Sequence, residues 1–159
     1  MKWGLVALAL LFACNRQATF QVGPTTVHYV DFAMVYPDTN ETLWRSRNCL
    51  NQNGLPAHEI LSIDLIIHGP GAQIQTPRDS LGYGREFSGH LIAGSYWDGE
   101  IQIVQRPAET RLIDSAFLHE LLEHRVPDVV DGTKNEQHDP KVKEKAANLE
   151  TCIREVSDA

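Results

Sequence analysis

The chain has 159 residues, of which 42% are hydrophobic and 22% charged, and its formal net charge is −7. This length corresponds to one domain, and the composition is typical of a folded globular protein rather than a disordered one. The acidic balance argues against a general nucleic-acid binder, because affinity for phosphates depends on Lys and Arg. No apolar run reaches the roughly 18 residues of a transmembrane helix, and no Gly-rich nucleotide-binding loop is present.

The N-terminus has the features of a targeting segment. Lys2 precedes a short apolar run over residues 4–12, which is too short to span a membrane. The sequence LFAC at 11–14 resembles the cleavage box of a bacterial lipoprotein signal. The resemblance implies a signal peptide over residues 1–13, a lipid on Cys14 and a place in the cell envelope, at the outer membrane in a Gram-negative host. Plain secretion and a buried first helix are the alternatives.

The next segments predict a tether followed by alternating strands and helices. Residues 15–24 are polar, so we expect a tether over 14–24 and a single domain over 25–159. Residues 25–35 are rich in β-branched and aromatic side chains, which predicts a strand. A helix is expected over 41–51, ended by an Asn-Gly pair, and a second strand over 59–68, where apolar residues alternate.

The second half of the domain predicts a loop, a hairpin and two helices. The loop covers residues 69–84, and the hairpin has strands at 88–96 and 100–105 around Asp98-Gly99, a strong signal for a tight turn. Apolar residues at helical spacing predict a helix over 112–126, which Pro127 should end. An acidic, turn-rich segment at 127–140 and a last helix at 141–156 follow. The fold class is therefore α+β: a small mixed or antiparallel sheet packed with the 112–126 helix and a C-terminal helix.

Three cysteines are present. If Cys14 carries lipid, Cys49 and Cys152 remain as a pair in an oxidising compartment, where disulfides persist. We therefore predict a disulfide between them, with two free buried thiols as the alternative.

The sequence HELLEH at 119–124, together with His138 fourteen residues later, is the candidate metal-binding motif of the chain. A catalytic zinc needs three nitrogen or oxygen ligands, an open position for water, and a carboxylate that accepts the water's proton. On a regular helix, however, residues five apart point about 140° away from each other. His119 and His124 can therefore meet at one ion only if the helix contains an extra residue, as in a π-bulge.

Two resemblances support a zinc site. HELLEH matches five of the six residues of HELLGH in the dipeptidyl peptidase III family, where the two histidines bind zinc and the first Glu is the base. The order of hairpin, HE-bearing helix, Gly-Asp loop and third histidine is similar to that of small secreted zincin-like metallopeptidases. The resemblances imply a zinc metallopeptidase with a zincin-like fold, whose hairpin strand pairs with a peptide or protein substrate. They imply zinc ligands at His119, His124 and His138, Glu120 as general base, and Asp139 or Glu136 as partners of a ligand imidazole.

Other interpretations stay open. His119, Glu123 and His138 form a ligand set that needs no bulge, because residues at i and i+4 share a helix face. The same residues are also compatible with a solvated helix face, on which Glu120 pairs with His124. The chain is then a non-enzymatic surface lipoprotein, a binding module whose metal is structural or absent. The residue that stabilises an oxyanion is not identified by the sequence; Tyr83 and Tyr96 are the candidates.

Overall fold

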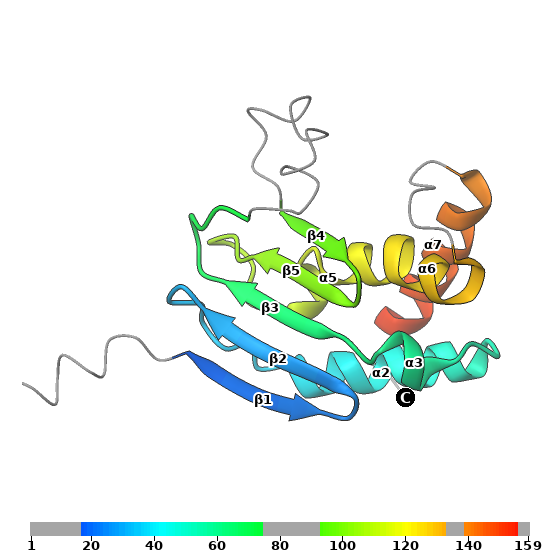
Figure 1. The fold of residues 1–159 in the computed structure, drawn as a ribbon, viewed down its shortest axis with the longest axis horizontal. Helices are drawn as coiled ribbons and strands as arrows, with labels where there is room; N and C mark the ends of the chain where they lie inside the picture. Colours follow the sequence, from blue (N-terminus) through cyan, green and yellow to red (C-terminus); the bar gives the residue numbers. More distant parts are fainter. Residues whose placement is uncertain (1–16, 75–92, 133–138, 156–159) are drawn as a thin grey trace, which may run out of the picture.

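A five-stranded mixed sheet forms one layer of the domain (Figure 1). The computed structural model describes residues 17–74, 93–132 and 139–155. The strand order is β1-β2-β3-β5-β4, with β2, β3 and β5 parallel and with β1 and β4 antiparallel at the two edges. The strands are β1 Ala18–Val22, β2 Thr25–Val30, β3 Asp64–His68, β4 Gly94–Trp97 and β5 Glu100–Val104.

The helices cover one face of this sheet (Figure 1). They are α2 Thr39–Gln52, α3 Ala57–Ile60, the 3-10 helix η3 Leu112–Asp114, α5 Phe117–His119, the π-helical segment η4 Glu120–Arg125, α6 Val126–Asp131 and α7 Pro140–Glu155. With the sheet they confirm the predicted α+β class.

Side-chain alternation explains the two layers. In the central strands every second side chain is apolar and fully buried, as Leu65 and Ile67 in β3 and Ile101 and Ile103 in β5 show. The residues between them face the other way and are only partly buried. Because successive side chains point to opposite faces of a sheet, one face makes the core with the helices and the other stays open.

The hairpin signal is confirmed. Asp98 and Gly99 both have positive φ, at 46° and 82°, and they connect β4 to β5. Such a turn matches the twist of the flanking strands. The part of the predicted first hairpin strand before residue 93, and the predicted loop from residue 75 onward, lie outside the described residues.

Three sequence predictions are wrong at the local level. Part of the predicted tether forms β1, which turns at Gly23 and pairs with β2, and the Phe20 ring stacks on Tyr29 with centroids 5.9 Å apart. The second predicted strand begins instead with α3, because Pro56 fixes the backbone at a helix start and Ala57 and Ile60 point into the core. Residues 31–35 leave the sheet after β2.

The predicted disulfide is confirmed: Cys49 in α2 is bonded to Cys152 in α7, 103 positions later in the sequence. The bond ties the C-terminal helix to the first long helix of the layer. The signal peptide and Cys14 lie outside the described residues. Among the helices of the described ranges, none is long and apolar enough to cross a membrane.

Candidate metal centre

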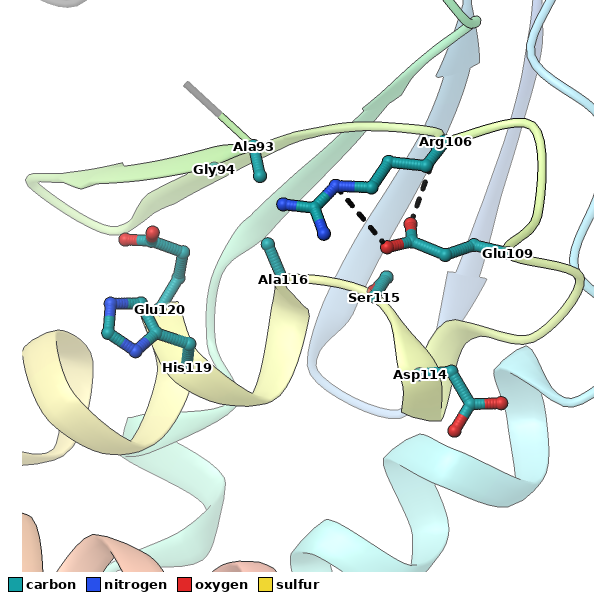
Figure 2. Close-up of a pocket in the computed structure, with 9 residues that line it drawn as sticks. All are labelled: Ala93, Gly94, Arg106, Glu109, Asp114, Ser115, Ala116, His119 and Glu120. Carbon is teal, nitrogen blue, oxygen red and sulfur yellow. Dashed lines mark hydrogen bonds and ion pairs between the residues drawn. The ribbon is translucent and has the colours of Figure 1, made fainter. Parts of the chain in front are cut away.

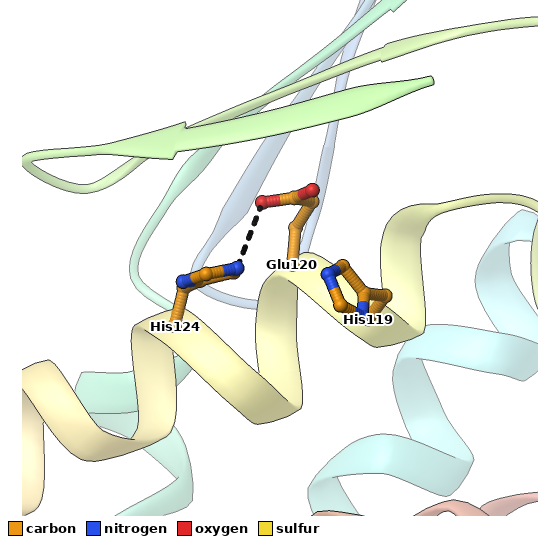
Figure 3. A group of neighbouring side chains, drawn as sticks. All are labelled: His119, Glu120 and His124. Atoms are coloured by element: carbon orange, nitrogen blue, oxygen red, sulfur yellow. Dashed lines mark ion pairs between the residues drawn. The ribbon is translucent and has the colours of Figure 1, made fainter. Parts of the chain in front are cut away.

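The π-helical segment η4 brings His119 and His124 together (Figure 3). Their ring centroids lie 5.3 Å apart, with 77° between the ring planes. One ligand atom from each of His119, Glu120 and His124 can be chosen so that all three lie within 4.8 Å of one another. The wider turn therefore supplies the extra residue that the five-residue spacing requires.

Pro127 gives a physical reason for this wider turn. It is the second residue of α6 and is buried, so the helix runs through it to Asp131 instead of ending there as the sequence analysis predicted. Proline has no N–H for the carbonyl of Glu123, and its ring pushes against that carbonyl. The regular hydrogen-bond ladder is therefore interrupted one turn after His119, where the π-helical segment lies.

Core packing and Arg125 hold the two ends of η4. Leu121 and Leu122 are buried beneath the segment. Arg125 donates from Nε to the carbonyl of Ile60 at 3.1 Å and from Nη2 to the carbonyl of Glu59 at 2.8 Å. These carbonyls belong to the end of α3, where backbone acceptors lack partners within the helix.

Tyr96 belongs to the same anchor, and its hydroxyl is engaged in three hydrogen bonds there. Its hydroxyl donates to the Asp128 carboxylate and accepts from Arg125 Nη1 at 3.1 Å and from the Gly99 N–H at 3.2 Å. Burial, followed by the hydrogen bond to Asp128, raises the pKa of Tyr96 above its usual value. Tyr96 thus fixes the hairpin against the helix, while Tyr83 lies outside the described residues.

Glu120 is a buried carboxylate at the base of the site, with only 5% of its surface exposed. Its Oε2 lies 3.8 Å from Nε2 of His124. On its other side it meets Gly94, the first residue of β4, where an added Cβ would lie 3.0 Å from both Cγ and Oε1 of Glu120. Because residue 94 has no side chain, the Glu120 carboxylate has room beside β4. No local pattern in the sequence indicates this role of Gly94.

A pocket of about 380 Å³ opens beside these side chains (Figure 2). His119 and Glu120 lie at one end, and an ion pair lies at the other, with Arg106 Nε 3.6 Å from Glu109 Oε1. The remaining lining residues are mostly small: Ala93, Gly94, Asp114, Ser115 and Ala116. The candidate acid–base group thus faces a space large enough for part of a substrate.

Glu123 contacts His119 but is not part of the three-residue group. Its Oε2 lies 3.5 Å from Nδ1 of His119. If Nδ1 binds Glu123, Nε2 of the same ring stays available as a ligand. This geometry suits a carboxylate that orients a ligand histidine. It also brings together two members of the bulge-free ligand set, His119 and Glu123, whose third member, His138, lies outside the described residues.

Two polar residues position the start of the helix. Asp38 is buried and accepts hydrogen bonds from the backbone N–H groups of Leu112 at 2.7 Å and Ile113 at 3.1 Å. Ser115 Oγ accepts from the N–H of Phe117 at 3.2 Å, as a capping side chain does. The sequence could suggest the Ser115 cap, but the contact from Asp38 joins residues 74 positions apart.

The third predicted ligand and one predicted partner are not placed. His138 and Glu136 lie outside the described residues. Asp139 is described, and its Oδ1 accepts from the N–H of Lys141 at 2.8 Å, so it caps the start of α7.

The donor set fits zinc. Imidazole nitrogens are ligands that zinc accepts, and two nitrogens on one tetrahedral ion lie roughly 3.4 Å apart, which follows from the usual Zn–N distance. Side-chain rotations within the present grouping can reach that separation, because His119 is more than half exposed. Comparisons of the chain with family models, with characterised proteins and with solved structures gave no match.

Proposed function

We propose that this protein is a zinc-dependent metallopeptidase, with zinc held by His119, His124 and His138 and with Glu120 as the general base. The observation that carries the proposal is the π-helical turn, which gathers two histidines and a buried glutamate beside a pocket. Such turns are rare in helices and occur mostly at functional sites. A solvated helix face would not need one.

Each residue of the chain has a role in this proposal. Zinc at this site would make water acidic enough to lose a proton near neutral pH and would polarise a peptide carbonyl. Glu120, buried at the wall of the pocket, accepts that proton and passes it to the leaving amine. Glu123 holds Nδ1 of His119 and so fixes the ring that binds the ion.

Strand β4 supports a peptide as the substrate. It lies at one edge of the sheet, whereas β5 lies between β3 and β4 and has both edges paired. Of the two hairpin strands that the sequence left open, β4 is therefore the one whose outer edge pairs with no strand among the described residues, and such an edge can accept an extended chain. It begins at Gly94, which lines the pocket next to Glu120.

Zinc analysis of the full chain, with the disulfide intact, tests the site. We expect about one zinc per chain in the parent, and loss of zinc in His119→Ala, His124→Ala and His138→Ala. His58→Ala is the matched control, because His58 is an exposed histidine in α3 outside the site, and it should keep the zinc. Absence of zinc from the parent after reconstitution would overturn the proposal and leave a non-enzymatic lipoprotein.

A second variant separates catalysis from metal binding. Glu120→Gln should keep zinc and lower hydrolysis of an internally quenched peptide library by about 10²–10⁴-fold, the contribution typical of a general base. If the variant keeps both zinc and full turnover, Glu120 is not the base. If the zinc-loaded parent cleaves no peptide, the metal is structural.

A further inference from the structure

A loop of apolar side chains projects from one end of the sheet. The described residues include six exposed large hydrophobic side chains, and three of them lie in the segment 31–35, which we name the apolar loop. Phe32 is 77% exposed, Met34 67% and Val35 58%. Such a concentration on so short a segment marks a surface that contacts an apolar partner.

The apolar loop is held in place by its backbone, so its side chains stay outside. Gln105, which is buried, accepts from the N–H of Met34 at 2.8 Å and donates to its carbonyl. Asp31 and Phe32 both have positive φ, at 52° and 60°, which is unusual for residues with side chains. Gly69 packs against this backbone so closely that a Cβ would lie 1.9 Å from the carbonyl oxygen of Asp31.

The described part of the chain begins beside this loop. Ala18, the first residue of β1, pairs with Tyr29, and β2 ends one residue later at Val30, where the apolar loop follows. Cys14 is four residues before Ala18, which allows at most about 14 Å of extended chain. A lipid on Cys14, which the sequence predicts, would therefore be tethered within that reach of the end of the sheet that carries Phe32 and Met34.

We propose that the apolar loop dips into the membrane surface to which the N-terminal segment attaches the protein, and so fixes the orientation of the domain on the lipid. The partner is the lipid surface, because the chain leading to the predicted anchor ends next to the loop. This inference rests on the predicted anchor and not on the metal site. It also places the pocket near the membrane, because Arg106, which follows Gln105, lines the pocket.

Methionine and tryptophan provide the probes for a test. The chain has two methionines, Met1 in the predicted signal and Met34 in the apolar loop. Trp44 is 57% exposed on α2 and serves as the internal reference. The full chain is incorporated into vesicles of phosphatidylethanolamine and phosphatidylglycerol, exposed to hydroxyl radicals, and the oxidation of Met34 relative to Trp44 is measured by mass spectrometry.

We expect the ratio of Met34 oxidation to Trp44 oxidation to be at least fivefold lower in the parent than in Phe32→Ser/Val35→Ser. This double variant keeps Met34 and the predicted anchor. Val130→Ser, which removes an exposed apolar side chain from α6, should behave as the parent. Equal ratios in parent and double variant overturn the proposal. Protection that weakens as the protein is diluted in the vesicles also overturns it and assigns the loop to a second copy.

A second measurement does not depend on the variant. With methyl-labelled methionine, the Met34 signal of the vesicle-bound parent should broaden when nitroxide headgroup lipids are added. A sharp Met34 signal in their presence contradicts insertion.

Discussion

The ring centroids of His119 and His124 lie 5.3 Å apart, although the two residues are five positions apart along one helix. On a regular α-helix these side chains would point about 140° away from each other. The π-helical turn between them brings the two side chains to the same side of the helix. Pro127 interrupts the regular hydrogen-bond ladder at this turn. The geometry of the site therefore depends on the backbone of η4 as much as on the ligands.

Pro127→Ala should weaken zinc binding although residue 127 is not one of the proposed ligands. Alanine restores the N–H that a regular helix needs, so the turn can relax to α-geometry and separate the histidines. We expect at least a tenfold loss of zinc affinity with little change in thermal stability, measured by competition with a chromophoric chelator. Pro140→Ala, at the first residue of α7, is the control. Unchanged affinity in Pro127→Ala would show that core packing alone sets the turn.

Glu123→Gln should weaken zinc binding without abolishing it. The amide holds Nδ1 of His119 less well than the carboxylate 3.5 Å away, so the ring is less well oriented and less basic. Loss of such an outer partner costs about 10–100-fold in metal affinity. Titration of zinc into the metal-free chain measures the change. A complete loss, as large as in His119→Ala, would instead make Glu123 a ligand.

Gly94→Ala should lower turnover and leave zinc content unchanged. The new methyl group would lie 3.0 Å from Cγ and Oε1 of Glu120, so the carboxylate must move by a few tenths of an ångström. A displaced base loses its alignment with the reacting water. We expect kcat to fall about tenfold or more in a peptide cleavage assay, whereas Ser95→Ala, the next residue of β4, should keep the parental rate. Equal rates for the two variants would mean that Glu120 tolerates the shift.

Local patterns in the sequence predict part of the fold. Asp98-Gly99 predicts the hairpin, alternation predicts the buried face of β3, and the cysteine count predicts the bond between Cys49 and Cys152. The sequence also identifies the condition under which the two histidines of HELLEH meet. These features depend on residues close together in the sequence or on the number of residues of one type, and a single sequence contains both.

The features that the sequence does not predict depend on contacts between residues that are distant in the chain. Pro127 was expected to end the helix, because a proline interrupts the ladder, but burial against the core continues the helix through it. β1 is polar enough to resemble a tether, and its pairing with β2 becomes visible only in three dimensions. Gly94 and Asp38 contribute to the site through contacts that no spacing reveals.

Asp38→Ala should destabilise the fold through the start of the helix that carries the site. Its carboxylate accepts from the N–H groups of Leu112 and Ile113 in a buried setting, and removal leaves both donors without that acceptor. We expect the free energy of unfolding to fall by about 2–3 kcal/mol in urea denaturation. Asp64→Ala, on the open face of the sheet, should cost less than about 0.5 kcal/mol. Similar losses in both variants would show that the Asp38 contacts contribute little.

Removal of the disulfide should destabilise the protein more than any of these substitutions. The bond between Cys49 and Cys152 closes a loop of about one hundred residues, so its loss gives the unfolded chain much more freedom. In Cys49→Ser/Cys152→Ser we expect a loss of about 3–5 kcal/mol and a fall in Tm of roughly 10–15 °C. Calorimetry of the oxidised parent, the reduced parent and the double variant measures it, and the last two should agree. A Tm that reduction does not change would mean that packing of α7 on α2 holds the C-terminal helix without the bond.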